Sequence, residues 1–190
     1  MKTTQLLTTL KQQTEEIVRT VETKFAGLPD DQLNAKPGPG RWSILECFEH
    51  LNLYNQYYLT ALENALSKSS AAAYNQDMKY TWIGKKSIAM MNPSNKKKQK
   101  TFRKMVPSTS RLTRDVLATF LNDQQRILQL IDRSFSVNAT RSVVPVEFFK
   151  LLKMNITETL EFVIVHEQRH VLQAENVLKL NTSSEPALSV

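Results

Sequence analysis

Three histidines occur in this chain, and two of them lie four residues apart. His166 and His170 belong to an apolar-periodic stretch, TLEFVIVHEQRHVLQAENVL, and His50 belongs to another, SILECFEHLNLYNQYYLTAL. A spacing of four puts two imidazoles one helical turn apart on the same face, where both can bind one ion. A third imidazole from a neighbouring helix leaves one coordination position open, as catalytic metal sites do. We therefore predict that His50, His166 and His170 bind a divalent metal.

The alternative interpretation is that these histidines are ordinary core residues. A lone histidine on an apolar helix face is usually a hydrogen-bonded core residue. A pair at this spacing is different, because burying both as bystanders requires two satisfied hydrogen-bonding networks within one turn. Cys47 precedes His50 by about one turn, and we interpret it as a small core residue. Four residues are candidates for orienting the imidazoles or holding water: Glu46, Tyr54, Glu167 and Gln173.

Residues 166–170, HEQRH, also satisfy the HExxH pattern of zinc proteases, in which the glutamate is the general base. The pattern fixes only three positions, and no HxxGxxH extension follows it. Glu175 lies too close to the pair to be a further ligand, and Glu185 lies in the expected tail. No strand is expected that could align an extended peptide. We therefore keep Glu167 as a candidate catalytic base but do not expect a peptidase.

Long helices must position these side chains, and apolar residues recur at helical spacing in four stretches. Ser43 and Glu46 have the spacing of a capping box, which predicts that the helix carrying His50 begins there. Four helices of about 25 residues span roughly 37 Å each at 1.5 Å per residue. No strand alternation competes, so we predict an all-α, antiparallel four-helix bundle. The predicted helices cover about residues 3–26, 43–67, 107–134 and 155–180.

The connections between these helices are predicted to be irregular. Two prolines and two glycines make a helix improbable in LNAKPGPGRW, residues 33–42. Residues 68–107 form a long loop between the second and third helices, with a short helix expected near 84–91. A loop of this length is usually a lid, a wrap across the bundle, or disordered. A turn of helix is expected near 146–152, and the tail 181–190 is expected to be disordered.

The net charge of +7 is concentrated in one stretch. Residues 79–114 hold eleven Lys and Arg and no acidic residue, whereas the rest of the chain holds 14 basic and 18 acidic residues. The simplest interpretation is a solvated loop. The functional alternative is a collar that attracts an anionic small-molecule substrate, with Lys96, Lys97 and Lys98 as candidate cofactor-binding residues. Nucleic acid is not expected as a partner, because the aromatic residues here form no stacking platform and no known binding motif occurs.

The composition favours a single domain over residues 1–180. The 41% hydrophobic content of 190 residues is enough for one globular core. Cys47 is the only cysteine, which excludes an internal disulfide. The N-terminus lacks the apolar core of a signal peptide, and no apolar run approaches the roughly 18–20 residues of a membrane span. We therefore expect a cytoplasmic protein with no membrane partner.

Two segments of the chain resemble the DinB-like superfamily, which includes the DinB and YfiT-like proteins. They are GPGRWSILECFEHLNLYNQYYL, with Trp42 just before the helix and a histidine eight residues later, and HEQRHVLQAENVL. The resemblance covers about residues 3–180. It implies an antiparallel four-helix bundle that holds zinc or nickel on His50, His166 and His170, and often a homodimer. The characterised enzymes of this superfamily are thiol-dependent transferases and isomerases that use bacillithiol, mycothiol or glutathione, and other members are described as metal-dependent hydrolases.

Our leading functional hypothesis is a metal-dependent thiol transferase. The metal would bind a low-molecular-weight thiol and lower its pKa, and the thiolate would attack an electrophile. One alternative is a metal-dependent hydrolase in which the metal activates water and Glu167 is the base. Another is a bundle that binds metal without catalysis. The ligand set leaves the metal open, because three imidazoles suit zinc, nickel, copper and iron.

Overall fold

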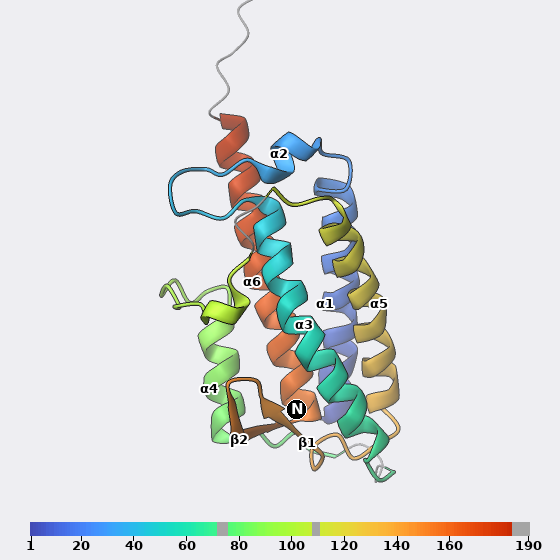
Figure 1. Ribbon diagram of the computed structural model, residues 1–190. Coiled ribbons are helices and arrows are strands. Elements are labelled where there is room, and N and C mark those ends of the chain that lie inside the picture. Colours follow the sequence, from blue (N-terminus) through green and yellow to red (C-terminus); the bar gives the residue numbers. More distant parts are fainter. Residues whose placement is uncertain (72–75, 108–110, 184–190) are drawn as a thin grey trace, which may run out of the picture.

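Helices make up most of the computed structural model, which describes residues 1–71, 76–107 and 111–183 (Figure 1). The expectation of a mostly helical protein is confirmed. The expectation of a disordered tail is wrong for residues 181–183, which continue the last helix, and residues 184–190 lie outside the described part. The long helices are α1 (Thr3–Lys24), α3 (Ile44–Ser67), α5 (Asp115–Ser134) and α6 (Ile156–Ser183). The short ones are α2 (Asp30–Asn34), α4 (Trp82–Met91) and the 3₁₀ turn η1 (Arg103–Met105).

The four long helices pack side by side with two running in each direction (Figure 1). Helix α3 contacts both α5 and α6, and α1 contacts both on the other side. Helices α1 and α6 run upward in Figure 1 and α3 and α5 run downward, so α3 is antiparallel to α6 but parallel to α5. This parallel packing, which α1 and α6 also show, was not expected. It arises because the segment between α3 and α5 carries the chain back along the bundle before α5 begins.

The start of α3 is fixed by the predicted capping box. Ser43 Oγ accepts from the Glu46 backbone N–H at 3.2 Å, and the Ser43 backbone N–H donates to Glu46 Oε2 at 2.8 Å. Lys36 Nζ lies 2.7 Å from Glu46 Oε1. These contacts satisfy backbone groups that are otherwise free at a helix start. They therefore fix where α3 begins, and with it the turn that carries His50.

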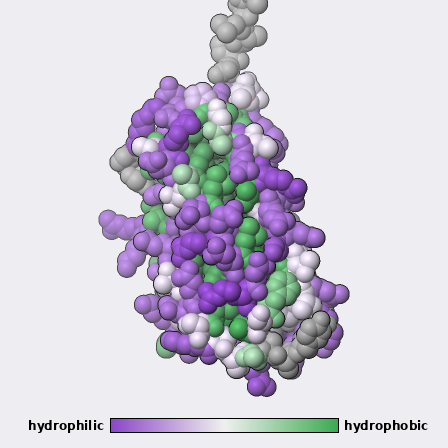
Figure 2. Space-filling model, turned by 90° about the vertical axis from the view of Figure 1, so that its right-hand side faces the viewer, coloured by the Kyte–Doolittle hydropathy of each residue, from purple (hydrophilic) through white to green (hydrophobic). Residues whose placement is uncertain are grey.

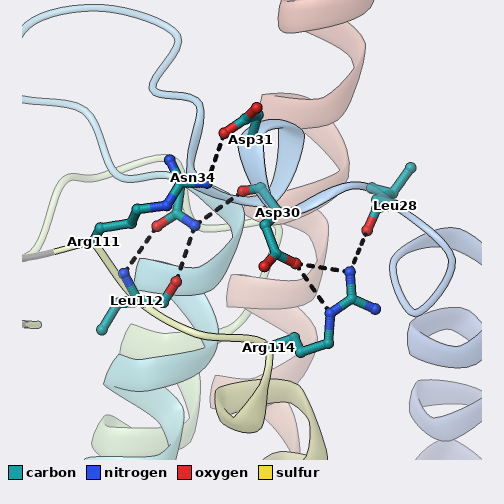
Figure 3. A network of polar contacts seen from close by, with 7 residues as sticks. All are labelled: Leu28, Asp30, Asp31, Asn34, Arg111, Leu112 and Arg114. Atoms are coloured by element: carbon teal, nitrogen blue, oxygen red, sulfur yellow. Dashed lines mark hydrogen bonds and ion pairs between the residues drawn. The ribbon is translucent and has the colours of Figure 1, made fainter.

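Helix α5 begins at Asp115, later than the predicted start near Pro107 and Ser108. Ser108 itself lies outside the described residues. The reason for the late start is a pair of hydrogen bonds to Leu112 (Figure 3). The Leu112 backbone N–H donates to Asn34 Oδ1, and Asn34 Nδ2 donates to the Leu112 carbonyl, each at 3.0 Å. These backbone groups are therefore held by α2, which the sequence did not predict.

Ion pairs between α2 and the segment before α5 strengthen the same junction (Figure 3). Arg114 donates to Asp30 Oδ1 at 2.7 and 3.0 Å and to the Leu28 carbonyl at 3.1 Å. Arg111 lies 2.6 Å from Asp31 Oδ1. All four charged side chains are largely exposed, so each pair adds little stability by itself. Their effect is to fix the path of the chain as it enters α5.

A two-stranded antiparallel hairpin replaces the turn of helix predicted near 146–152. Its strands are β1 (Val143–Val146) and β2 (Phe149–Asn155). The expectations of a helical turn here and of no strand were both wrong. Three of the four β1 residues are valine, which favours strands, and the fourth, Pro145, lacks an N–H and suits a short edge strand. Tyr57 Oη donates to the Pro145 carbonyl at 3.2 Å, which ties the hairpin to α3.

Helix α4 was predicted near 84–91 and begins two residues earlier. Thr81 Oγ1 caps it by accepting from the Gly84 backbone N–H at 3.0 Å. Glu158, which is fully buried on α6, accepts from the Thr81 backbone N–H, from Thr81 Oγ1 at 3.1 Å and from the Asn155 backbone N–H at 2.8 Å. One carboxylate therefore joins the starts of α4 and α6. Gly84 leaves it the space to do so, because a Cβ there would overlap that carboxylate.

Gly84→Ala is therefore expected to lower the free energy of unfolding by about 1–3 kcal/mol, the usual range for an extra carbon in a filled site. Urea unfolding measures the change. Gly27→Ala is the matched control, because nothing lies within 4 Å of a Cβ there. Equal unfolding midpoints for the two variants would contradict the docking of α4 on Glu158.

The side of the molecule on which α5 lies is mainly hydrophilic, with a narrow hydrophobic strip between the polar residues (Figure 2). This is the surface expected of amphipathic helices that turn their apolar faces toward one core. Across the described ranges, none of the helices combines the length and the apolar character needed to cross a bilayer.

Candidate metal centre

The three histidines meet between α3 and α6. Their potential ligand nitrogens all lie within 4.8 Å of one another, and His50 Nε2 is 3.3 Å from His166 Nε2. The exposed fractions are 2% for His50, 3% for His166 and 9% for His170, so His170 is the most accessible. The four-residue spacing on α6 and the position of His50 on α3 thus place three imidazoles around one point.

Hydrogen bonds orient two of the rings toward that point. His50 Nδ1 donates to the Met105 carbonyl of η1 at 2.6 Å, since a carbonyl oxygen can only accept. His170 Nδ1 donates to Gln173 Oε1 at 3.0 Å. In both rings this leaves Nε2 unprotonated, as a metal ligand requires, and such partners also set the ring orientation. The donor set therefore fits a divalent ion that prefers imidazole nitrogen.

Burial also keeps the three rings neutral. Desolvation lowers the pKa of His50 to about 4, partly opposed by the hydrogen bond to Met105. Desolvation and the neighbouring His50 lower the pKa of His170 to about 3. The pKa of His166 lies well below its ordinary value, because it is fully buried and close to the other two rings. At neutral pH the protons that compete with a metal are therefore absent.

A cavity of about 440 Å³ opens onto the triad. Trp42 forms part of its wall, with its ring centroid 4.8 Å from that of His50 and 5.7 Å from that of His170. Trp42 directly precedes the capping box of α3, so the same local structure positions the indole and the helix. Tyr54 also lines the cavity, and burial raises the pKa of its phenol to about 12. The space beside the ligands is large enough for a small molecule.

The basic segment forms another part of the cavity wall. Lys98 and Lys100 line it together with the residues next to them in sequence. Of the other two candidate lysines, Lys96 lines an adjoining pocket, and Lys97 is in the lining of neither. Residues 96–100 are exposed, as expected of a solvated loop, and part of the segment also lies beside the histidines.

Arg169 holds this segment in place. It lies on α6 between two of the histidines, and its guanidinium donates to the carbonyls of Asn92 at 3.2 Å, Asn95 at 2.7 Å and Lys97 at 3.0 Å. These are the residues that follow α4. The helix that carries His166 and His170 therefore also fixes the backbone that places the lysines at the cavity.

Glu167 points away from the cavity. It is fully buried, and its Oε1 accepts from Asn55 Nδ2 of α3 and Gln124 Nε2 of α5, each at 2.9 Å. It is not among the residues that line the cavity. Burial raises the pKa of its carboxyl to about 7, partly opposed by these two hydrogen bonds.

The remaining candidates have structural surroundings. Glu46 belongs to the capping box that its spacing from Ser43 predicted. Cys47 is fully buried in the core, and burial raises the pKa of its thiol. Gln173 contacts His170, so among the proposed orienting residues it is the one with a direct hydrogen bond to a ring.

The comparison with known families shows which superfamily the chain belongs to. A family model described as the DinB superfamily matches residues 13–174. This chain belongs to the DinB superfamily. No curated protein and no solved structure matches it. The family match confirms the resemblance seen in the segments around Trp42 and HEQRH, and its range includes all three histidines and the basic segment.

Two residues of this DinB-superfamily site were missed from the sequence. Met105 contributes only its backbone carbonyl, which has no sequence signature. Arg169 was not singled out, although its place within HEQRH offered a signal, because a residue three after His166 lies near it on the helix surface. Trp42 was noted as part of the resemblance, but its contact with two imidazoles follows only from the structure.

Proposed function

We propose that this DinB-superfamily protein is a metal-dependent thiol transferase that binds zinc or nickel on His50, His166 and His170. In this proposal residues 1–180 form one domain, built on the four-helix bundle of the superfamily. A bound ion would lower the pKa of a coordinated thiol, so that the thiolate prevails at neutral pH. The observation that carries the proposal is that neutral imidazoles and lysine side chains line the same cavity.

The residues around the triad suit an anionic thiol. Lys98 and Lys100 raise the local concentration of anions and can hold a carboxylate. Trp42 and Tyr54 cover the ligands with ring surface and limit the access of water. Among the described residues that line the cavity there is no Asp or Glu. A thiolate needs no general base to attack an electrophile. A cavity lining without a carboxylate therefore favours thiol transfer over hydrolysis.

Hydrolysis is the second candidate, and it rests on Glu167. The pKa of this carboxyl is raised to about 7, the range in which a general base works best at neutral pH. Its Oε2 is buried and has no hydrogen-bond partner within the described residues. Its position outside the cavity lining is the argument against it, because a base must reach the attacking water.

Turnover by the zinc- and nickel-loaded protein distinguishes the candidates. The transferase predicts that one thiol from a panel of cysteine, glutathione, bacillithiol and mycothiol is conjugated to 1-chloro-2,4-dinitrobenzene. This activity should disappear in His50→Ala. Hydrolysis of 4-nitrophenyl acetate without thiol, lost in Glu167→Gln, would instead establish the hydrolase. Silence in both assays would leave a bundle that binds metal without catalysis.

A homodimer and a cytoplasmic location stay predictions of the same proposal. Light scattering on the purified protein would test the first, and fractionation of the cells would test the second.

A further inference from the structure

A second pocket adjoins the metal cavity. This outer pocket, of about 230 Å³, shares Arg41, Trp42, Arg169 and Gln173 with the inner cavity, the one that opens onto the histidines. Lys96 lines the outer pocket only. The two spaces therefore meet around the Trp42 ring, and a ligand longer than either one can occupy both.

Cationic side chains without acidic partners line both spaces. Arg41 and Lys96 line the outer pocket, and Lys98 and Lys100 line the inner cavity. No ion pair forms between any of these four and another described residue, although Arg111 and Arg114 of the same basic stretch are paired. No described Asp or Glu lines either space. Like charges that converge without a counter-charge favour the binding of an anion.

The backbone around the two outer cations is fixed. Arg41 follows a turn in which its backbone N–H donates to the Gly38 carbonyl at 3.2 Å, and Gly40 has a φ of +67°, which suits glycine. Next to Lys96, Asn95 Nδ2 donates to the Met90 carbonyl at 3.1 Å, and Asn95 Oδ1 accepts from the Lys97 backbone N–H at 3.1 Å. The backbone that carries the two charges is therefore already ordered before a ligand binds.

Arg169 is not available to a ligand in the same way. Its guanidinium already donates to three backbone carbonyls of the segment after α4. This leaves Arg41 and Lys96 as the cations of the outer pocket that are free to bind an anion.

We propose that the outer pocket is a carboxylate-binding subsite, formed by Arg41 and Lys96, for the far end of an elongated low-molecular-weight thiol. The inference rests on the proposed function, because it takes the sulfur end to lie at the histidines. The middle of the ligand lies against the Trp42 ring. The ligand class is a thiol with carboxylates several bonds from its sulfur. A short thiol such as 2-mercaptoethanol cannot reach the subsite.

Binding of S-methylglutathione to the zinc-loaded protein tests this subsite by isothermal titration calorimetry. This probe has two carboxylates but no thiol, so it binds without forming a thiolate. We expect Arg41→Gln/Lys96→Gln to weaken its binding about tenfold or more, which corresponds to the loss of about 1.4 kcal/mol. The diethyl ester of the probe should bind both proteins equally weakly. The difference between the two proteins should shrink as salt rises.

Lys85→Gln/Lys150→Gln is the matched control. It removes the same charge from two exposed residues that line neither space. An equal loss of affinity in the control would show that the probe responds to the overall positive charge of the protein and not to a local subsite, which would overturn the proposal. So would equal affinity of the wild type and Arg41→Gln/Lys96→Gln, or failure of the wild type to bind the probe. Circular dichroism and zinc content must match among the variants.

The same experiment separates this proposal from the proposed function. If no thiol supports turnover but S-methylglutathione binding still depends on Arg41 and Lys96, the transferase is wrong and the carboxylate subsite stands. If thiol turnover occurs but the probe binds all variants alike, the transferase stands and the subsite is wrong.

Discussion

His170→Ala is expected to lose metal affinity by at least about 100-fold while it keeps most of its helical circular dichroism. Mutation of a residue that only orients a metal ligand usually costs 10–100-fold, so removal of the ligand itself should cost more. His170 lies at the edge of the cavity, and the apolar core of α1, α3, α5 and α6 does not depend on its ring. Two imidazoles would remain, which is too few for a stable three-nitrogen site.

The measurement is elemental analysis of protein purified without an affinity tag, followed by competition with a chelator. Gln173→Ala provides the graded comparison. It removes the acceptor of His170 Nδ1 but no ligand, so we expect a loss of about 10–100-fold. Gln129→Ala, an exposed change on α5, should match the wild type. Unchanged metal stoichiometry in His170→Ala would refute its assignment as a ligand.

The sequence was sufficient to place these histidines because helical periodicity determines which residues share a face. A spacing of four fixes His166 and His170 relative to each other whatever packs against them. The capping box at Ser43 likewise depends on residues three apart and was predicted correctly. Each of these features is local, so a single helix suffices to define it.

The features that were missed depend on contacts between distant segments. The late start of α5 results from hydrogen bonds between Leu112 and Asn34, 78 residues away in the chain. Part of the hairpin at 143–155 was predicted as a turn of helix, because the periodicity of a short apolar run does not distinguish a strand from a helix. The hydrogen bonds from Arg169 to the carbonyls after α4 use backbone acceptors, which every residue has. These partners are chosen by the fold, so their residue types do not reveal them.

Acid should destabilise the metal-free protein strongly below pH 6.5. In the unfolded chain the three imidazoles take up protons near their ordinary pKa of 6.5. In the folded protein burial lowers the pKa of His50 to about 4 and that of His170 to about 3, and it lowers that of His166 as well. Between these values the unfolded chain binds more protons than the folded one. The contribution of the neutral imidazoles to the free energy of unfolding is therefore complete above pH 6.5 and is lost as the pH falls toward 4.

The size of this loss follows from the pKa differences. At about 1.4 kcal/mol for each pKa unit, His50 and His170 each lower the free energy of unfolding by on the order of 3 kcal/mol when the pH falls to 4. That sum is comparable with the whole stability of a typical domain, about 5–15 kcal/mol. Glu167 acts in the opposite direction. Because its pKa is raised to about 7, the folded protein binds its proton more readily, and stability rises as the pH falls from 7 toward 4.5. One carboxyl offsets only part of the effect of three imidazoles.

Urea unfolding of the metal-free protein at pH 7.0 and pH 4.5 measures the balance. The midpoint should fall at the lower pH in the wild type. Glu167→Gln should fall further, since it lacks the opposing contribution, and His170→Gln should fall less, since one buried imidazole is gone. We therefore expect the decrease in midpoint to be largest in Glu167→Gln, intermediate in the wild type and smallest in His170→Gln. Equal midpoints at the two pH values in the wild type would show that the three rings are not held neutral by burial, and the main argument for a metal-ready triad would fail with them.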